Sequence, residues 1–388
     1  MTHRHSASSL DHSETTAPSP PRDLKIAGDA PSEDEAVLIP VESQRSWGRA
    51  LRERGPATLR KVSLVCALLT VLGLGVAVLA LHLGSEPIPR TIVGRILWAH
   101  LFGQTGEPTI AEVIIWRIRG PRVLLGLAAG AALALAGTLL QALLRNPLAE
   151  PYVLGVSGGA ALGAILALLK WEAVPMARPL LAFLGAALTM ALVYAMSRRR
   201  TGMSTERLVL AGVMTATLLW SVIALVLALV PNPRLRGLTF WMMGDLSGGG
   251  NGMLPFILGV VIGACVLAYV HARELNLLLV GEEEARLLGV EVERVKTLIY
   301  LLASLLAGGI VSVAGAIGFV GLVVPHLVRL LWGSDHRVVI PAAALSGAIV
   351  LTLADALART VLAPRELPVG AVTTLLGVPF FFLLLRRA

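Results

Sequence analysis

The sequence predicts an all-α integral membrane protein with about ten transmembrane helices. Hydrophobic residues make up 55% of the chain and charged residues only 15%, and the mean hydropathy is +0.76. This composition excludes an ordinary soluble domain. The long apolar runs also lack the alternating polar residues that strands of a membrane β-barrel would show, so we expect helices.

Eight uncharged apolar runs reach about 17 residues or more, the length that a helix needs to cross a bilayer. They lie at 62–83, 123–144, 153–169, 180–196, 208–230, 254–270, 338–354 and 369–385. A ninth run, 298–324 with its apolar continuation to 332, is too long for one span and too short for two full spans. A full helix, a turn and a short second helix would fit this run, which brings the expected total to ten.

The N-terminal region differs from the rest of the chain. Residues 1–58 are rich in Ser, Pro, Asp and Glu, so we expect a disordered cytoplasmic extension before a membrane domain at 59–388. Arg and Lys gather just before the first apolar run, which places the N-terminus in the cytoplasm, and ten spans return the C-terminus to that side. Arg117, Arg119 and Arg122 break the pattern, because this topology places them outside.

Two connections should lie on the outer side. The first, 85–122, carries Trp98 and Trp116, which are aromatic residues suited to a membrane interface. The second, 231–252, should form a short interfacial helix at 240–246 before a glycine-rich turn. Cys66 and Cys265 lie in separate apolar runs and offer neither a disulfide framework nor a metal site.

A charged, helix-prone insert at 275–296 interrupts the apolar sequence. Glu282, Glu283, Glu284 and Arg286 fall within about one helical turn. A mostly apolar protein retains such a block where the block faces water, so we expect it to dock on a soluble partner. The chain has no G-x-x-x-x-G-K-[ST] loop, so if ATP drives this protein, another polypeptide must bind the nucleotide.

Gly155, Ser157 and Gly159 satisfy G-x-S-x-G, the nucleophile elbow of hydrolases. That elbow needs a strand before it, whereas here the motif opens an apolar helix. Gly155, Gly159 and Gly163 recur at four-residue spacing, which lets helix backbones approach closely. Helix packing is therefore the favoured interpretation, and a membrane-embedded hydrolase that uses Ser157 is a distant alternative.

Ionisable residues inside apolar sequence leave a second alternative open. Asp355 and Arg359 lie four residues apart and could form either a functional intramembrane site or an i,i+4 ion pair near the interface. His326 could relay protons or be a satisfied residue of a helix start. A proton-driven secondary transporter that uses Asp355 and His326 is the rival to an ATP-driven protein.

Seven motifs, in this order, resemble the transmembrane permeases of bacterial ABC importers for ferric siderophores, haem and vitamin B12. They are R-G-P-R at 119–122, N-P-L-A-E-P-Y-V-L-G-V-S-G-G-A at 146–160, W-M-M-G-D-L at 241–246, G-E-E-E-A-R-L-L-G-V at 281–290, G-F-V-G-L-V-V-P-H-L-V-R at 318–329, A-D-A-L-A-R at 354–359 and E-L-P-V-G-A-V-T-T-L-L-G-V-P-F-F at 366–381. The resemblance covers the chain from about residue 62 to its end.

The resemblance implies the type II ABC importer permease fold, with ten helices per subunit. It implies a homodimer in the bacterial cytoplasmic membrane, two copies of a cytoplasmic ABC ATPase, and a periplasmic or extracellular substrate-binding protein. ATP and Mg would lie on the ATPase, and no cofactor or nucleic acid on this chain. The expected cargo is an iron(III) chelate, a siderophore or haem, carried by alternating access. Vitamin B12 is the alternative cargo.

The resemblance also implies roles for particular residues. The coupling helix that seats in the ATPase corresponds to 281–290, with Gly281, Glu282, Glu283, Glu284, Ala285, Arg286 and Gly289. Outward-facing arginines that grip acidic residues of the binding protein correspond to Arg119, Arg122 and Arg359. Such charge pairing orients a docking partner and would explain the arginines outside. A helix-packing and pathway segment corresponds to Asn146, Pro147, Gly155, Ser157 and Gly159.

Overall fold

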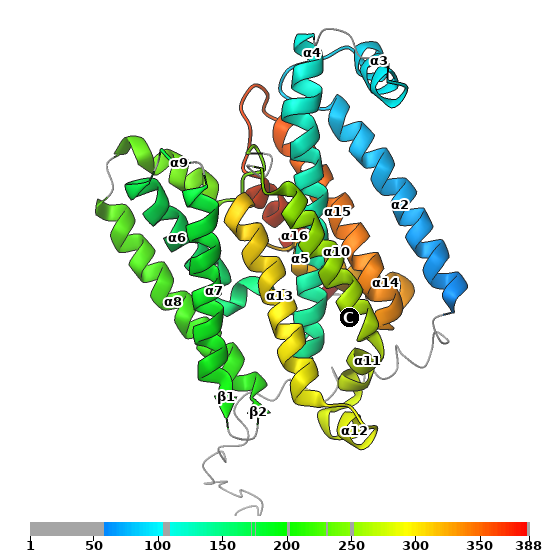
Figure 1. Ribbon diagram of the computed structural model, residues 1–388, viewed down its shortest axis with the longest axis vertical. Coiled ribbons are helices and arrows are strands. Elements are labelled where there is room, and N and C mark those ends of the chain that lie inside the picture. The colour runs from blue at the N-terminus through cyan, green and yellow to red at the C-terminus, as the bar shows by residue number, and fades with distance from the viewer. Residues whose placement is uncertain are drawn as a thin grey trace, which may run out of the picture. The chain divides into compact units, whose positions relative to one another are not determined.

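The computed structural model describes residues 58–385, apart from short gaps at 104–108, 172, 175, 200–201, 230–231 and 249–251. The extension predicted at 1–58 lies outside these residues, except for Thr58. Figure 1 shows that the described part is almost entirely helical, so the predicted all-α class is confirmed. The one sheet in this part is a two-residue hairpin, β1 (Arg198–Arg199) paired antiparallel with β2 (Gly202–Met203).

The first half of the chain supplies five apolar helices. Their bounds, with those of the short helices between them, are α2 (Leu59–His82), α3 (Arg90–Leu101), α4 (Ile110–Val113), the π-helical η1 (Ile114–Arg119), α5 (Gly120–Leu143), the 3-10 turn η2 (Pro151–Leu154), α6 (Val156–Lys170), α7 (Ala177–Ser197), α8 (Thr205–Leu229) and α9 (Asn232–Met242). Because α4, η1 and α5 follow one another without a break, they form a single helix of 34 residues.

The second half supplies five more apolar spans and one short charged helix. The elements are α10 (Leu254–Val270), α11 (Ala272–Val280), α12 (Glu282–Leu287), α13 (Val292–Ala314), α14 (Val320–Trp332), α15 (His336–Thr360) and α16 (Val369–Leu385). The predicted full helix, turn and short second helix over 298–332 are confirmed by α13 and α14.

The count of possible spans agrees with the prediction of about ten. Six helices of the described part are long and apolar enough to cross a membrane, and α10 with α11 adds a seventh, bent by 58°. The shorter apolar helices α6, α14 and α16 complete the set. The family resemblance and the apolar runs therefore lead to the same architecture.

Two predicted boundaries differ from the structure. The span expected at 123–144 begins much earlier, at Ile110, because η1 carries the helix through the arginine-rich segment. The interfacial helix expected at 240–246 is wrong, since α9 already ends at Met242. Gly244 has a φ of 89°, a left-handed backbone conformation that ends the helix and is open to glycine at little cost.

Helix α5 forms the centre of the described bundle (Figure 1). On one side lie α15, α14 and α2, and on the other side α13 separates α5 from the group of α6, α7 and α8. A Cβ atom on Gly130 of α5 would lie 2.1 Å from the Gly347 carbonyl oxygen of α15, and one on Gly137 would lie 1.9 Å from the Gly321 carbonyl oxygen of α14. Small residues therefore allow the backbones of these helices to touch.

Candidate coupling and docking sites

Helix α12 lies at the same end of the bundle as strands β1 and β2, and we call this the α12 end (Figure 1). Of its residues Ala285 is buried, whereas Glu283, Glu284 and Arg286 are exposed. Gly289 has a φ of 84°, and the Val290 N–H donates to the Ala285 carbonyl at 3.0 Å. Such a left-handed glycine and its hydrogen bond stop a helix, so α12 is a short, separate element.

The outer face of α12 combines charge with apolar surface. Leu287 is 88% exposed and Leu288, which follows the helix, is 63% exposed. Apolar side chains in such positions, beside acidic and basic groups, are typical of a surface that a partner covers. The coupling segment predicted at 281–290 is therefore a protruding helix with its turn, and the helix occupies Glu282–Leu287.

A polar cluster around the buried Lys296 lies beneath α12, and the sequence did not indicate it. Lys296 of α13 is 3% exposed; its Nζ donates to the Met203 carbonyl at 2.7 Å and to Glu282 Oε1 at 3.0 Å. Glu293, one turn earlier, accepts a hydrogen bond from the Met203 N–H at 2.7 Å. A lysine near the start of an apolar span was the one available signal, but the Met203 carbonyl that it binds lies 93 residues earlier.

The three arginines expected to face outward are buried instead. Arg119, Arg122 and Arg359 are 4%, 7% and 2% exposed. They lie at the opposite end of the bundle, where α4 begins and α15 ends (the α4 end) (Figure 1). An unpaired guanidinium group in an apolar setting is costly, so internal partners have drawn all three inward. Their role in docking stays a prediction, and these side chains have partners within the chain rather than free guanidinium groups at the surface.

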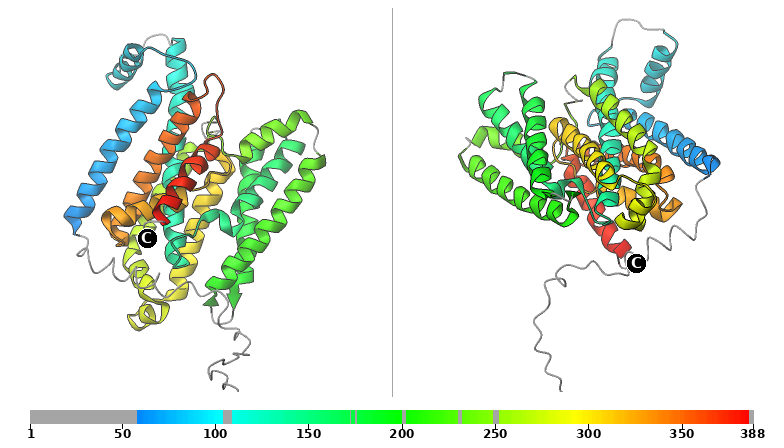
Figure 2. Two further views of the ribbon diagram at one scale, coloured as in Figure 1. Left: turned by 180° about the vertical axis from the view of Figure 1, so that it is seen from behind. Right: turned by 60° about the horizontal axis from the view of Figure 1, so that its bottom comes forward.

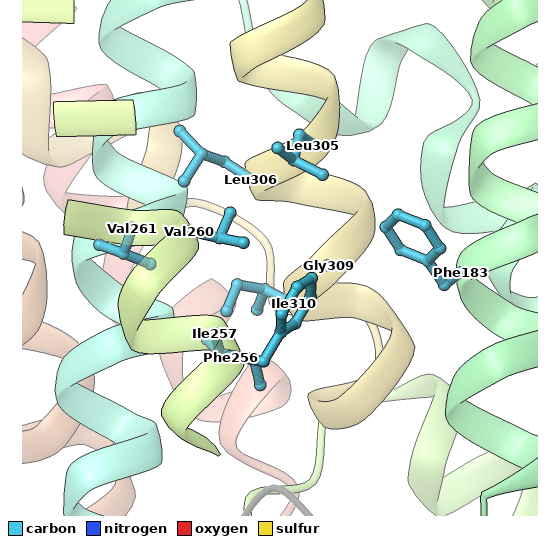
Figure 3. Close-up of a pocket in the computed structure, with 9 residues that line it drawn as sticks. All are labelled: Phe183, Phe256, Ile257, Val260, Val261, Leu305, Leu306, Gly309 and Ile310. Atoms are coloured by element: carbon cyan, nitrogen blue, oxygen red, sulfur yellow. The ribbon is translucent and has the colours of Figure 1, made fainter. Parts of the chain in front are cut away.

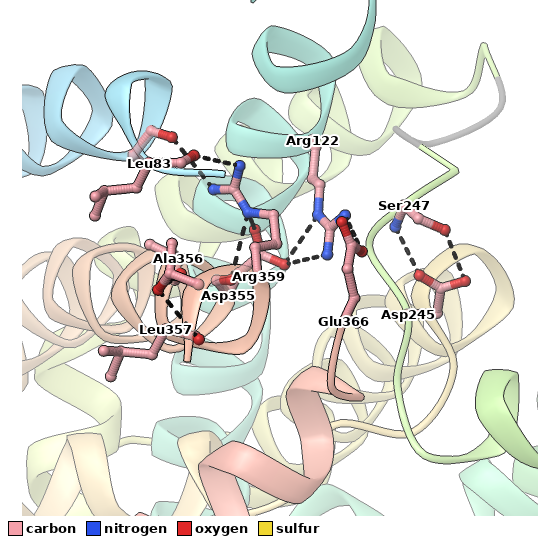
Figure 4. Close-up of polar contacts among 11 residues, drawn as sticks. Leu83, Arg122, Asp245, Ser247, Asp355, Ala356, Leu357, Arg359 and Glu366 are labelled. Atoms are coloured by element: carbon pink, nitrogen blue, oxygen red, sulfur yellow. Dashed lines mark hydrogen bonds and ion pairs between the residues drawn. The ribbon is translucent and has the colours of Figure 1, made fainter. Parts of the chain in front are cut away.

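Figure 4 shows how Asp355 links two of these arginines. Arg122 Nε donates to Asp355 Oδ1 at 3.0 Å, and Arg122 Nη1 donates to Glu366 Oε2 at 2.7 Å. Arg359 Nε lies 3.0 Å from Asp355 Oδ2, and its Nη1 donates to the Leu83 carbonyl at 3.0 Å. The i,i+4 ion pair considered for Asp355 and Arg359 is therefore present, within a larger network.

Arg119 ties the end of α2 to η1. Its Nη1 donates to the Leu81 carbonyl at 2.9 Å and to the His82 carbonyl at 3.3 Å, and its Nη2 donates to the Glu86 carbonyl. Together the arginine networks hold the 83–86 connection and the 361–368 connection against α5. Exposed arginines at this end include Arg90 and Arg95 of α3 as well as Arg117 and Arg365, and sequence reasoning selected none of them for docking.

The segment that follows α5 holds the break between α13 and α14. The Asn146 carboxamide oxygen accepts from the Leu148 N–H at 2.9 Å, which shapes the turn around Pro147. The Glu150 carboxylate accepts from the Phe319 N–H at 2.6 Å, and the Tyr152 hydroxyl accepts from the Ile317 N–H at 2.8 Å. Burial raises the pKa of the Glu150 carboxyl, and the hydrogen bond from Phe319 acts in the opposite direction.

The glycines of the G-x-S-x-G segment lie against neighbouring helices. A Cβ atom on Gly159 would lie 2.1 Å from Thr189 Oγ1 and 2.4 Å from the Gly185 carbonyl oxygen of α7. Gly155 has a φ of 77° and starts α6, and Ser157 is buried. The segment before it is the 3-10 turn η2 rather than a strand, so the geometry of a nucleophile elbow is lacking at Ser157.

In the described structure Asp355 and His326, the two residues considered for a proton relay, have different contact partners. Both Asp355 oxygens are engaged by Arg122 and Arg359. The His326 ring packs against Phe381 with its centroid 6.0 Å from that of the phenyl ring. The two residues considered for this rival mechanism therefore belong to separate surroundings.

Three of the hollows in the described chain are apolar, and they differ in size. A crevice between α7, α10 and α13, lined by residues such as Phe183, Phe256 and Leu306, has a volume of only about 10 Å³ (Figure 3). A groove of about 390 Å³ lies between α14, α15 and α16, and a shallow one of about 600 Å³ lies along α8 and Val153. The larger hollows are open grooves, which a second molecule could complete.

This helical architecture, with its long apolar helices and broken spans, is that of a multi-span membrane protein. Residues 68–387 match the FecCD transport family, and the chain belongs to this family. The prediction from the seven motifs is therefore confirmed. Membrane permeases of this family are transport subunits rather than enzymes.

Named relatives share about two fifths of their residues with this chain. It is 42% identical over 317 residues to the uncharacterized ABC transporter permease protein YvrB of Bacillus subtilis, which covers 80% of this chain and 90% of the relative. It is 41% identical over 338 residues to the cobalamin import system permease protein BtuC of Halobacterium salinarum, covering 85% and 89%. It is 40% identical over 330 residues to the hemin transport system permease protein HmuU of Yersinia pestis, covering 82% and 93%.

A solved structure shares the fold. It is described as an inward-facing conformation of a putative metal-chelate type ABC transporter. The TM-score is 0.72 at 29% sequence identity, and the match covers 84% of this chain and all of the other. The similarity extends over the whole bundle, so the relationship is not confined to the short motifs.

Proposed function

We propose that this chain is the membrane subunit of an ATP-driven importer that carries an iron(III) chelate across the bacterial cytoplasmic membrane by alternating access. The observation that carries this proposal is α12, a charged helix with exposed leucines on a chain without a phosphate-binding loop. A separate ATPase that seats on α12 would supply ATP and Mg. Both termini of the chain would lie in the cytoplasm, on the side of the α12 end.

The importer would contain two copies of this chain, two ATPase subunits and a substrate-binding protein. Support for the homodimer comes from the open apolar grooves beside α16 and α8. Figure 2 shows α16, in red, on the outside of the bundle, where Leu375 is 73% and Phe382 is 67% exposed. A second copy that covers this helix would turn an open groove into an enclosed pathway.

The binding protein would dock at the α4 end. Because Arg119, Arg122 and Arg359 are engaged internally, their part in docking would be to position the 83–86 and 361–368 connections. The exposed Arg117 and Arg365 would meet acidic residues of the partner. Charge complementarity of this kind raises the rate of association and fixes the orientation of docking.

Two cargo classes fit the relatives. Haem is an iron chelate and is the ligand in the name of the Yersinia pestis permease, which agrees with the proposed iron(III) chelate. Cobalamin is the ligand in the name of the Halobacterium salinarum permease and is the second candidate. Uptake of labelled haemin, a ferric siderophore and cyanocobalamin by cells with and without the chain distinguishes these cargoes.

Replacement of both Glu283 and Arg286 by Ala tests the role of α12. Uptake per ATP hydrolysed should fall about tenfold, because the exposed charges of α12 would no longer engage the ATPase. The matched control replaces Glu291 and Arg294, an exposed ion pair on the following turn with a distance of 2.6 Å. Intact coupled uptake in the first variant would refute the proposal, and uptake that persists without ATP but stops with a proton uncoupler would favour the secondary transporter.

A further inference from the structure

One polar cluster around the buried Lys296 joins the consecutive helices α12 and α13 to a hairpin that lies much earlier in the sequence. Glu282 belongs to α12, Lys296 and Glu293 belong to α13, and Met203 belongs to the hairpin that precedes α8. Figure 1 shows the hairpin and α12 at the same end of the bundle, on either side of the start of α13. The coupling role proposed for α12 involves neither Lys296 nor the hairpin.

The ammonium group of Lys296 forms a bridge of hydrogen bonds between α12 and the hairpin. Its side chain is 4% exposed, and its Nζ donates to the Met203 carbonyl at 2.7 Å and to both oxygens of Glu282 at 3.0 and 3.2 Å. An ammonium group has three donors, and here three acceptors surround it. Loss of one partner would leave the buried ammonium group without full compensation of its charge, which is costly. The lysine therefore stabilises the arrangement in which α12 and the hairpin are both in place.

The backbone of the hairpin is hydrogen bonded to α13, and the Met203 side chain is buried in the core. The Met203 N–H donates to Glu293 Oε2 at 2.7 Å while the Met203 carbonyl accepts from Lys296. Gly202 has a φ of 124°, and a Cβ atom there would lie 2.2 Å from the Glu293 carboxyl carbon. Only a residue without a side chain lets the hairpin approach α13 this closely.

The cluster adds polar contacts to the apolar packing of α12. Within α12, which is described in full, Ala285 alone is buried. Arg286 lies 3.8 Å from Glu282 and 3.5 Å from Glu293, so the exposed surface of α12 is also linked to the cluster. At the other side, α8 begins at Thr205, two residues after Met203.

We infer that Lys296 is a positioning residue that transmits displacement of α12 to the 198–204 hairpin and so to the start of α8. The inference rests on the proposed ATPase seat at α12. When α12 moves, Glu282 moves with it, and the ammonium group of Lys296 links that carboxylate to the backbone of Met203. A movement of α12 would therefore also move the hairpin and α8. Without this link it would reach only α11 and α13, the helices on either side of α12 in the sequence.

The test compares amide hydrogen exchange with and without ATP in the whole complex, held in lipid nanodiscs with the ATPase that purifies with the tagged chain. The variants are Lys296→Met, the conservative Lys296→Arg, and Arg294→Met. Arg294 is the matched control because it lies two residues away on α13 with a side chain 84% exposed. ATP should alter exchange at both 282–290 and 198–204 in the wild type and in Arg294→Met.

In Lys296→Met the response at 282–290 should persist, whereas the response at 198–204 should fall about tenfold. Lys296→Arg should restore most of it, since a guanidinium group can also bridge a carboxylate and a carbonyl. If Lys296→Met does not assemble, Glu293→Gln serves instead, because it weakens the acceptor for the Met203 N–H at a side chain that is 40% exposed. That variant should reduce the hairpin response about threefold.

Two failures are distinguishable. A wild-type complex in which 282–290 does not respond to ATP contradicts the proposed ATPase seat, and with it the inference. A hairpin response that stays at the wild-type level in Lys296→Met overturns the role of Lys296 and leaves the ATPase seat standing. If that variant does not assemble, an unchanged response in Glu293→Gln overturns transmission through the Met203 backbone, on which the role of Lys296 depends.

Discussion

Asp355 joins two arginines that lie on different helices, Arg122 of α5 and Arg359 of α15. Its side chain is 2% exposed, and the carbonyl oxygens of α2 supply further acceptors for Arg359. A buried ion pair adds little net stability over an apolar pair, but removal of one member is costly because the other charge remains. At this residue the network therefore holds α2, α5 and α15 in one arrangement.

Asp355→Asn should lower the stability of the chain by about 3 kcal/mol, because two buried guanidinium groups would lose their shared carboxylate. The measurement is the thermal unfolding midpoint of the protein in detergent. The matched control is Asp245→Asn, whose carboxylate accepts from Ser247 within its own loop and should cost about 1 kcal/mol or less. Equal midpoints for the two variants would contradict the importance of the network.

At the scale of elements, contacts between glycine backbones determine which helices pair. Gly159 and Gly185 place the backbones of α6 and α7 against each other, and Gly130 and Gly347 do the same for α5 and α15. Between membrane helices there is little hydrophobic driving force, so close van der Waals contact contributes much of the association. The spacing of small residues therefore indicates which face of a helix packs closely against another helix.

Gly159→Ala should destabilise the protein by about 2 kcal/mol, because the added methyl group would force α6 away from Thr189 and Gly185. Gly259→Ala on α10 is the control, since a Cβ atom there meets no atom within 4 Å. That control should be neutral, or more stable by up to about 1 kcal/mol from helix propensity. Comparable losses in both variants would show that the α6–α7 contact has no special role.

Much of this layout could be predicted from the sequence. Apolar runs located every span, because the bilayer sets the helix length, and glycines correctly divided 298–332 into two helices. The early start of the second span could not be predicted, since Arg117 and Arg119 within a helix look like a connection until their contacts are known. The partners of Arg122 lie 233 and 244 residues away, and no local pattern indicates such a pairing. The role of Lys296 could not be predicted either, because Met203, whose carbonyl it binds, lies 93 residues earlier.

The whole molecule has two functional ends joined by a tightly packed bundle. The α4 end presents Arg117 and Arg365 above a network of buried charges, and the α12 end presents an acidic and apolar helix above another. At the α4 end the paired charges belong to helices far apart in sequence, and at the α12 end Lys296 also holds the backbone of Met203, 93 residues earlier. Rigid anchoring of both ends suits a protein in which a partner at one side must influence the other.

Arg117→Glu combined with Arg365→Glu should weaken docking of the binding protein about tenfold at low salt. The effect should shrink as salt rises, because exposed charges are screened within about 10 Å at 0.1 M ionic strength. Titration of the purified binding protein onto the complex in nanodiscs, at two salt concentrations, measures both. The control is Arg294→Glu at the α12 end, which should leave the affinity unchanged. Unchanged affinity in the double variant would show that Arg117 and Arg365 do not take part in docking.

Leu287 and Leu288 have a consequence for the life of the chain in the cell. Both side chains face water, not lipid, if α12 protrudes from the membrane, and no neighbouring segment in the described part shields them. A subunit synthesised in excess of its ATPase would therefore display an adhesive surface, open to proteases and to aggregation. Cells that make this chain would need to produce both proteins in step, or else degrade the surplus.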